Sequence, residues 1–323
     1  MTHAFTRRAA TGLVAGAMVA AALGSASAQD VLKVAAGQRG NWDTAVVEMG
    51  MRSGIFPKHG LKLEILWTAG GGETQQAVLS NSVDVGVAAG TLGVLGAFSK
   101  GAPVRILGAQ ATGAADFWYA RADSKLKSIK DADANTTLAF STNGSSTQSV
   151  VLGFLAAYGL KAKPVATGSP PATFTQVMSG QIDVGWSSPP FGFDALEEGK
   201  IRIIARANDL PEIRNQSIRT LITNVQALQG KKEQLTRFMK AYRETIDWMY
   251  SNPAALTQYA DFAKTTEVYA KRIREEFFPK SLIDPDEMKG MDLVMRDAVQ
   301  FKAIPAPLTP DQLKELIQIP PRS

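Results

Sequence analysis

The short loop from Ser141 to Thr147 carries a dense set of hydrogen-bonding side chains, in the order Ser-Thr-Asn-Gly-Ser-Ser-Thr. Its glycine lets backbone approach a ligand, and the helix predicted to follow offers unpaired N–H groups and the positive end of its dipole. Capping that helix needs only one Ser or Thr. The other hydroxyls therefore indicate a ligand-binding loop, with candidate contact residues Ser141, Asn143, Ser145, Ser146 and Thr147.

A second group of candidates follows the first predicted strand. Gln38 and Asn41 offer amides, Arg39 a charge and Trp42 an aromatic face. Arg39 can pair bidentately with a carboxylate or a sulfonate. It can equally be a solvated surface charge, and Trp42 can instead pack against the helix that follows, so both alternatives stay open.

Further candidates lie at other strand ends and at a predicted crossing between the two halves of the chain. Small residues facing aromatic ones would form a slot for a planar or apolar part of a ligand, although such aromatics can also be core. Glycines can present backbone donors or simply form a turn. An acidic and an aromatic residue at the crossing can face a cleft or stiffen the connection. These candidates are Ala88, Ala89 and Thr91 opposite Trp186, Ser187 and Phe191, then Gly70 and Gly71, and finally Asp116 and Trp118.

Enzyme chemistry finds little support in the residues. The chain has no cysteine, and His59 is the only histidine after residue 28. Thiolate catalysis, disulfides, zinc fingers and iron–sulfur clusters are therefore excluded, and any Ser-His-Asp triad would have to use His59. Phosphate-loop, nucleophile-elbow and zinc-protease motifs are missing. The run Ser124-Lys125-Leu126-Lys127 lacks the companion motifs of a Ser-x-x-Lys enzyme. We predict a protein that is not an enzyme and that uses no cofactor and no metal.

The first 28 residues are typical of an export signal. Arg7 and Arg8 form a basic start, residues 13–23 an apolar run, and Ala26-Ser27-Ala28 a cleavage site. The apolar run is too short to span a bilayer of about 30 Å. Thr6-Arg7-Arg8 also resembles a twin-arginine signal without its usual Phe-Leu, so the general secretory and twin-arginine routes both stay open. We expect a cleaved leader, residues 1–28, and a periplasmic mature chain.

Composition bounds what the mature chain can be. Cleavage would remove two arginines and no acid, so the formal charge of +5 would fall to +3. A chain of 323 residues that is 45% hydrophobic and 20% charged is ordinary for a globular protein, and so mild a charge argues against nucleic-acid binding. The length left after cleavage suggests about two domains.

Strand and helix patterns alternate in both halves of the chain. Such alternation predicts parallel sheets with crossover helices. In the first half the expected strands are residues 31–36, 61–67 and 83–88, with helices at 43–54 and 74–80. In the second half the expected strands are 137–140, 164–167 and 182–187, with helices at 148–158 and 172–179.

The two halves also share a short repeat. Residues 78–86 align with residues 177–185 at an offset of 99, with five of nine positions identical, and Thr74 aligns with Thr173. Both segments fall at the same helix-turn-strand step. We interpret the halves as two related α/β lobes.

Two segments are expected to join the lobes. Residues 105–121 would leave the first lobe as one long extended stretch, and residues 218–224 would return to it. A helical tail at 231–251, 266–278, 286–300 and 310–317 would complete and cover the first lobe. We therefore expect residues 29–114 and 218–323 in lobe I and residues 115–217 in lobe II.

The chain resembles a known family at several places. The run Gly54-Ile55-Phe56-Pro57-Lys58-His59-Gly60-Leu61, the repeated Ile/Val-Asp-Val-Gly and the leader are similar to periplasmic solute-binding proteins of ABC importers. The nearest class serves nitrate, sulfonates, taurine and thiamine-pyrimidine precursors. The resemblance implies a type II periplasmic-binding-protein fold, in which two doubly wound, mainly parallel sheets flanked by helices are joined by a two-crossing hinge. It also implies an inner-membrane ABC permease with its cytoplasmic ATPase as the partner.

The expected function is capture of a small-molecule solute between the lobes by a monomeric carrier. Hydroxyl-rich helix N-termini and Arg39 favour a small organic anion, a sulfonate or carboxylate with or without an aromatic group. The aromatic candidates favour a thiamine-precursor-like pyrimidine or another heterocycle instead. A sensory module that presents its ligand to a membrane receptor is a further alternative.

Overall fold

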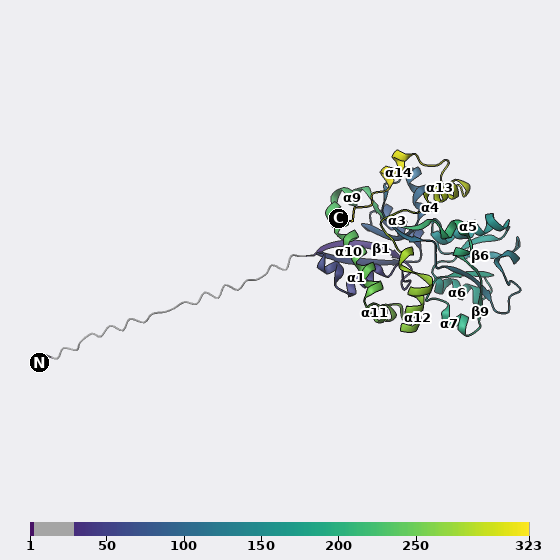
Figure 1. The fold of residues 1–323 in the computed structure, drawn as a ribbon, viewed down its shortest axis with the longest axis horizontal. Helices are drawn as coiled ribbons and strands as arrows, with labels where there is room; N and C mark the ends of the chain where they lie inside the picture. The colour runs from purple at the N-terminus through teal and green to yellow at the C-terminus, as the bar shows by residue number, and fades with distance from the viewer. Residues whose placement is uncertain (3–28, 323) are drawn as a thin grey trace.

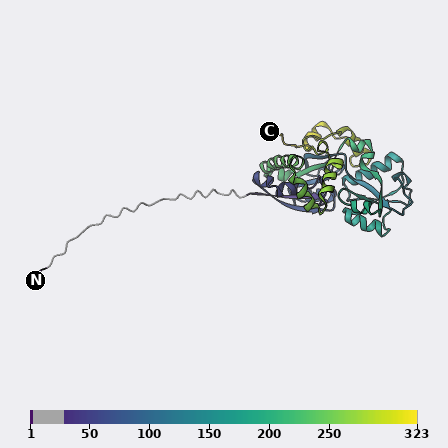
Figure 2. The same ribbon diagram turned by 60° about the horizontal axis from the view of Figure 1, so that its bottom comes forward.

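The computed structural model describes residues 1–2 and 29–322 of the chain. Residues 29–322 form two lobes, each built on a five-stranded sheet (Figures 1 and 2). The first sheet has the order β2-β1-β3-β10-β4 and the second β7-β6-β8-β5-β9. The strands of the first sheet are β1 (Asp30–Gly37), β2 (Leu61–Thr68), β3 (Val85–Gly90), β4 (Val104–Thr112) and β10 (Ser217–Asn224). Those of the second are β5 (Phe117–Arg121), β6 (Thr137–Phe140), β7 (Lys163–Ala166), β8 (Val184–Ser187) and β9 (Ile201–Arg206).

In each sheet, three neighbouring strands that include one edge strand run parallel, and the fourth strand runs antiparallel to both of its neighbours. In the first, β1 runs parallel to β2 and β3, and β10 lies antiparallel between β3 and β4. In the second, β6 runs parallel to β7 and β8, and β5 lies antiparallel between β8 and β9. The carboxyl ends of the three parallel strands therefore meet at one edge of each sheet. The loops at these edges are where ligands bind in open α/β sheets.

The predicted extended stretch over residues 105–121 is in fact two strands in different sheets. β4 ends at Thr112 in the first sheet and β5 begins at Phe117 in the second, so the crossing occupies residues 113–116. The return runs through residues 207–216, which form the 3-10 turn η2 (Ala207–Asp209) and helix α8 (Pro211–Arg214), before β10. Gly113, with φ of 68°, supplies a left-handed turn at the first crossing that favours glycine.

The sequence repeat corresponds to repeated hydrogen bonding. Asp84 Oδ2 accepts from Lys33 N at 2.9 Å, and the aligned Asp183 Oδ2 accepts from Thr137 N at 2.8 Å. Each carboxylate thus holds the backbone of the neighbouring strand, β1 or β6. The hydroxyls of Thr74 and Thr173 likewise bond those of Thr68 and Thr167, at 2.8 and 2.7 Å, and these pairs also stand 99 residues apart.

Helices cover both faces of each sheet. They include α1 (Val46–Arg52), α2 (Ile55–Lys58), α3 (Gly71–Leu79), α4 (Thr91–Ser99), α5 (Ser146–Tyr158), α6 (Pro170–Met178), α7 (Phe193–Glu197), α9 (Val225–Gly230), α10 (Lys232–Ser251), α11 (Ala254–Ala263), α12 (Glu267–Arg272), α13 (Met291–Gln300) and α14 (Pro310–Leu316). Shorter turns are η1 (Ile129–Asp131), η3 (Ile273–Phe277) and η4 (Lys280–Leu282). No helix in residues 29–322 combines the length and apolar character that crossing a membrane requires.

Three helix predictions need correction. The helix expected at 43–54 is shorter, α1 at Val46–Arg52, and the unexpected short helix α2 follows Gly54, which has a left-handed φ of 78°. The helix expected to begin at Thr74 begins at Gly71. α11 was not expected at all, although Pro253 and the alanines after it are typical of a helix start.

The helical tail packs mainly on the first lobe. α10 turns Leu235, Phe238, Met239, Tyr242 and Ile246 into the core, at the three- and four-residue spacing of one helix face. The α12–η3 segment differs, because Tyr269 and Phe277 pack on Phe193 of α7 in the second lobe. The tail therefore also ties the two lobes together.

Candidate functional site

The loops at the carboxyl ends of the two sheets touch one another across the interface between the lobes. Gly72 N donates to Thr142 Oγ1 at 3.0 Å. A Cβ atom at Gly90 would lie 2.4 Å from Gly144 O, and one at Gly93 would lie 2.3 Å from the same oxygen. Only residues without side chains allow so close an approach. We call this contact the glycine seam (Gly72, Gly90 and Gly93 against Thr142 to Gly144), and it shows the lobes in a closed arrangement.

A buried ionic cluster joins both lobes beside this seam. Arg219 of β10 donates from Nη1 to Asp43 Oδ2 at 2.7 Å and from Nη2 to Asp116 Oδ2 at 2.5 Å. Its Nε donates to Ser146 Oγ at the start of α5, at 2.9 Å. The side chain of Arg219 is 3% exposed and the two aspartates are fully buried.

Backbone topology explains why these four residues meet. Arg219 pairs with Gly90 at the carboxyl end of β3, and Phe117, next to Asp116, pairs with Ser187 at the carboxyl end of β8. Asp43 follows β1, and Ser146 follows β6. We call Asp43, Gln110, Asp116, Ser146 and Arg219 the cleft cluster, since Gln110 Nε2 also donates to Asp43 Oδ2 at 3.1 Å.

Burial dominates the electrostatics of the cleft cluster. Burial raises the pKa of Asp116, and nearby Asp43 raises it further, while Arg219 opposes both. Burial works to lower the pKa of Arg219, but the two carboxylates outweigh it and raise the pKa. Burial also raises the pKa values of Tyr242 and Tyr259, and the charge of Asp43 adds to both shifts. The negative potential of Asp43 therefore extends into the core of the first lobe.

Several polar atoms around the cluster have no hydrogen-bond partner among the described residues. The oxygens are Asn41 Oδ1, Asp43 Oδ1, Gln110 Oε1 and Asp116 Oδ1. Ser188 Oγ and Trp186 Nε1, at the end of β8, are also buried and unpartnered. Buried polar groups are normally paired, so these atoms require partners from outside the protein, either ordered water or a bound molecule.

The hydroxyl-rich loop is built differently from the sequence expectation. Ser145 caps α5 by accepting from Gln148 N at 3.2 Å, and Thr147 Oγ1 bonds both Ser141 N and Ser141 Oγ at 2.9 Å. Asn143 is exposed, and its Oδ1 accepts from Gln148 Nε2. Most of these side chains therefore shape the loop itself. Among the loop hydroxyls, that of Ser146 reaches the cleft cluster.

The candidates after β1 divide between the surface and the interior. Arg39 is exposed, with its guanidinium 4.5 Å from the ring centroid of Phe262. Trp42 is buried, and its Nε1 donates to Tyr250 Oη at 3.0 Å, so the packing alternative is the better account of it. Gln38 and Asn41 are buried and bonded to each other, Asn41 Nδ2 to Gln38 Oε1, at 3.3 Å. Of these four, only Asn41 offers an unpartnered buried atom.

The small residues of the first lobe serve close packing. A Cβ at Gly70 would lie 2.7 Å from Ser141 Oγ, and one at Gly71 would lie 2.5 Å from Ala88 O. Ala88 has a left-handed φ of 70°, a strained conformation for a residue other than glycine, at the end of β3 beside buried Ala89. The hydroxyl of Thr91 donates to Ser217 O at 2.6 Å, which occupies it within the first lobe.

The aromatic candidates of the second lobe lie in three different settings. Trp118 is fully buried against Phe154, and its Nε1 donates to Ala139 O at 2.9 Å. Trp186 is also fully buried but keeps a free Nε1. Phe191 reaches the first lobe, 3.2 Å from where a Cβ of Gly40 would lie. Together with Ser187, Tyr119 and Phe174, it lines a cavity of about 290 Å³.

Sequence reasoning missed three members of the cleft cluster: Asp43, Gln110 and Arg219. Arg219 carried a usable signal, because a lone charge inside the apolar strand Ser-Ile-Arg-Thr-Leu-Ile-Thr needs a buried partner. Asp43 directly follows the candidate Trp42, but the sequence pattern marks it only as the first residue of a predicted helix. Gln110 stands in an alternating run with no local feature that marks it.

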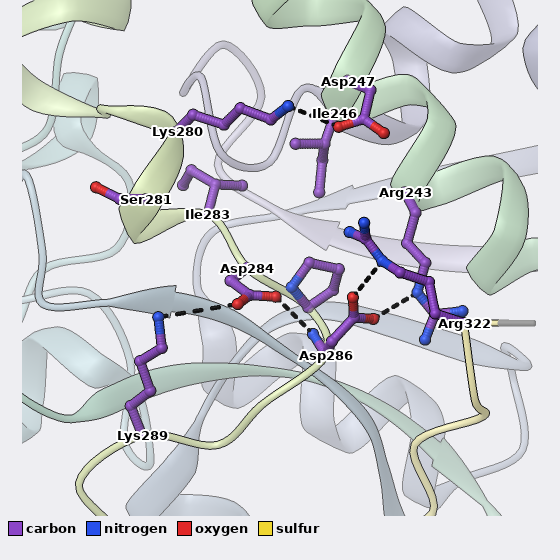
Figure 3. A pocket seen from close by; sticks show the side chains of 11 residues that line it. Arg243, Ile246, Asp247, Lys280, Ser281, Ile283, Asp284, Asp286, Lys289 and Arg322 are labelled. Carbon is purple, nitrogen blue, oxygen red and sulfur yellow. Dashed lines mark hydrogen bonds and ion pairs between the residues drawn. The ribbon is translucent and has the colours of Figure 1, made fainter.

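A larger cavity lies elsewhere, on the first lobe beside α10 and the end of the chain (Figure 3). It encloses about 600 Å³, but its charges are paired with one another. Asp286 accepts from Arg243 and Arg322, both at 2.5 Å, and Asp247 accepts from Lys280 at 2.7 Å. These charged groups are already paired with one another, and the cavity does not lie at the carboxyl ends of the strands of either sheet. We therefore prefer the cleft cluster as the candidate site.

No catalytic or metal-binding constellation stands out in residues 29–322. His59 lies at the end of α2, before β2, and its Nε2 is 2.8 Å from Glu244 Oε2. That position is at the amino end of β2, away from the cleft cluster. The described part of the chain contains no grouping of three or more His, Cys, Asp or Glu placed to hold a metal ion.

Comparisons with known proteins agree with this geometry. No curated protein matches the sequence closely enough to count as a relative. Among solved structures, the alkanesulfonate-binding protein of Xanthomonas axonopodis pv. citri bound to MOPS is 16% identical, with a TM-score of 0.72 over 91% of this chain and 100% of that one. The periplasmic aliphatic sulphonate-binding protein of Escherichia coli is 17% identical, with a TM-score of 0.68 over 91% and 93% of the two chains. The periplasmic nitrate-binding protein of Synechocystis PCC 6803 is 13% identical, with a TM-score of 0.68 over 90% and 86%.

At these identities the solved structures establish the fold, which is the two-lobed periplasmic-binding-protein fold expected from the sequence. The family is established by a separate match, which runs from the loop that carries Asp43 through β10 with Arg219 and into α11. Because the sequence profile described as NMT1/THI5 like matches residues 41–256, well over half of the chain, the protein belongs to the NMT1/THI5-like family of periplasmic-binding-protein fold.

Proposed function

We propose that this protein is the solute-binding component of an ABC importer. It captures a small polar solute between its lobes and presents the closed form to an inner-membrane permease that a cytoplasmic ATPase drives. One observation carries the proposal: the cleft cluster draws Asp43 and Arg219 from the first lobe, Asp116 from the crossing and Ser146 from the second lobe into a single buried site. A solute bound there would contact both lobes and favour their closure.

Export to the periplasm is part of the proposal. Residues 3–28 lie outside the described part of the chain, so the support comes from the leader pattern and from the periplasmic character of the solved relatives. The secretory route stays open between the two pathways. A monomer that diffuses between solute and permease fits this role.

Binding without chemistry also belongs to the proposal. The solved relatives are binding proteins by their descriptions. In the described residues, His59 pairs with Glu244 far from the cleft cluster, so a histidine-based catalyst would need another arrangement. The family resemblance and the site geometry both favour a carrier.

The expected organic anion receives less support than the carrier role. Arg39, on which that expectation depended, lies at the surface over Phe262. Arg219 is buried in the right place, but two carboxylates already neutralise it. We therefore propose a small polar solute without restricting it to sulfonates or carboxylates.

Thermal unfolding of residues 29–323 tests the proposal. The panel contains sulfonates, carboxylates, nitrate, pyrimidines and a deproteinised yeast extract. A solute at about 1,000 times its dissociation constant should stabilise the fold by about 4.1 kcal/mol, which raises the melting temperature by several degrees. Small-angle X-ray scattering should show a smaller radius of gyration in the bound form.

Paired variants tie the result to the site. Ser146→Ala removes the hydroxyl that accepts from Arg219 and should weaken binding, whereas Ser80→Ala, an exposed serine whose hydroxyl bonds only local groups, should not. Absence of stabilisation by every panel member and by the extract would refute the solute-binding role.

A further inference from the structure

The cleft cluster offers more hydrogen-bond acceptors and more negative charge than its own groups satisfy. We infer that the solute bound there is a small cation whose protonated nitrogen carries at least two N–H groups, such as an ammonium or amidinium ion. This inference rests on the proposed function, because it assumes that the cluster is the solute site.

Hydrogen bonding gives the first argument. Each nitrogen of the Arg219 guanidinium donates one hydrogen bond, and Gln110 Nε2 and Asn41 Nδ2 donate one each, to Asp43 Oδ2 and Gln38 Oε1. By contrast, one oxygen of each of four side chains has no partner among the described residues, namely Asn41, Asp43, Gln110 and Asp116. A molecule that pairs these four oxygens must bring N–H or O–H donors.

Charge gives the second argument. Two fully buried carboxylates share one guanidinium, so the ionised cluster carries one negative charge more than its own groups balance. An anionic solute would add a third negative charge beside the buried Asp43 and Asp116, where burial weakens screening by solvent. A cation would instead neutralise the site and donate to the free oxygens.

The neighbouring free groups fit the rest of such a solute. Ser188, which lies beyond Ser187 and so opposite Asp116 in the β5–β8 pair, has a buried hydroxyl without a partner, and Trp186 has a buried N–H without one. Both are neutral. They can bond a polar substituent of the solute without altering the charge that the aspartates set.

Ion-exchange fractionation of a deproteinised yeast extract provides the test. The extract is divided at pH 7 into a fraction that a cation exchanger retains, a fraction that an anion exchanger retains and an unretained fraction. Each is added to residues 29–323, and the melting temperature is measured. We expect the stabilising component in the fraction retained by the cation exchanger.

The outcomes separate this inference from the proposed function. Stabilisation found only in the anion-exchanger fraction or the unretained fraction would overturn the cationic assignment and leave the carrier role standing. No stabilisation by the unfractionated extract would remove the carrier role, and the inference with it.

Substitutions locate the effect. Asp116→Asn and Asp43→Asn each remove one negative charge and should weaken the apparent affinity for the active fraction at least tenfold. Asp123→Asn, at an exposed ion pair with Arg121, is the matched control and should change nothing. If either buried variant fails to fold, Gln110→Leu removes a free acceptor without changing charge and should still weaken binding. Equal affinity in Gln110→Leu and the parent protein would contradict the assignment.

Discussion

The two lobes share the hydrogen bonds that hold each sheet together, but they differ in the loops through which they contact each other. At an offset of 99 residues, Asp84 and Asp183 hold neighbouring strands, and Thr74 and Thr173 make the same hydroxyl pairs. At the facing edges the likeness ends. The first lobe presents glycines at positions 72, 90 and 93, and the second presents the loop from Thr142 to Ser146.

This contrast separates two demands on the chain. The sheet of each lobe must be stable by itself, and the same kinds of carboxylate and hydroxyl hydrogen bonds stabilise both sheets. The facing loops must fit each other, so glycines of the first lobe stand where residues 142–144 of the second lobe approach. Substitutions can test each demand separately.

The largest effect is expected where the two lobes share a charge. Arg219→Met leaves Asp43 and Asp116 buried without their cation, which typically destabilises a protein by about 3–5 kcal/mol. Urea unfolding should show this loss. Arg121→Met, at an exposed pair, should leave the unfolding midpoint unchanged, and a comparable loss there would show that the buried setting is not what matters.

The glycine seam is the next target. Gly93→Ala places a Cβ 2.3 Å from Gly144 O, so the lobes could not close fully, and solute affinity should fall at least tenfold. Because alanine favours a helix over glycine by about 1 kcal/mol and Gly93 lies in α4, stability should hold or rise. Gly230→Ala, also helical but with nothing within 4 Å, is the control that should keep full affinity.

Scattering distinguishes a closure defect from a binding defect. With saturating yeast extract, the parent protein should contract and the Gly93→Ala variant should stay extended. Normal contraction of the variant would contradict the role of the seam.

A smaller effect is expected at the turn that the repeat shares. Gly180 has φ of 77°, and its counterpart Asn81 has φ of 58°. Gly180→Ala should destabilise by about 1 kcal/mol, because a Cβ disfavours left-handed backbone. Asn81→Gly should be neutral or slightly stabilising. Urea unfolding of both variants measures this, and equal responses to the two changes would argue against equivalent turns.

The smallest effect is expected on the unfolding free energy at acid pH. Hydrogen bonds from Lys58 and His59 lower the pKa of Glu244 below its ordinary value of 4.5. A depressed pKa means that the stabilisation is complete above the unfolded-state pKa and is lost as pH falls through the folded-state pKa. Glu244→Gln should therefore flatten the pH dependence of the unfolding free energy below about pH 4.5. If the unfolding free energy of the variant changes with pH as steeply as that of the parent protein, carboxylates other than Glu244 cause this pH dependence.

Much of the fold could be read from the sequence, because alternating strand and helix patterns and the repeat are local signals. Strands β1, β2, β6 and β7 and helices α5 and α6 lie within two or three residues of their expected places. The expected lobe boundary, between residues 114 and 115, falls inside the stretch 105–121, but the break of that stretch into two separate strands was not predicted. Both β4 and β5 are buried and apolar, and only long-range pairing separates them.

The site was less predictable, since a hydroxyl in a loop looks the same whether it meets a ligand or its neighbour. Thr147 and Ser141 bond one another, and Arg39 lies on an aromatic ring from α11, which sequence spacing cannot reveal. Arg219 was within reach, because a charge in a buried strand requires compensation. Its partners, Asp43 and Asp116, come from distant parts of the chain.

The place of β10 between β3 and β4 has a consequence for how the chain becomes folded. Strands β5 to β9 are consecutive, so the second sheet can assemble from one continuous segment. The facing edges of β3 and β4 must wait, unpaired, until Ser217–Asn224 arrives after that whole segment. Because long loops close slowly, pulse-labelled hydrogen exchange should detect protection in the second sheet first. The first lobe is thus the last to be finished, and its open strand edges would be the surface of the folding polypeptide most exposed to pairing with other chains.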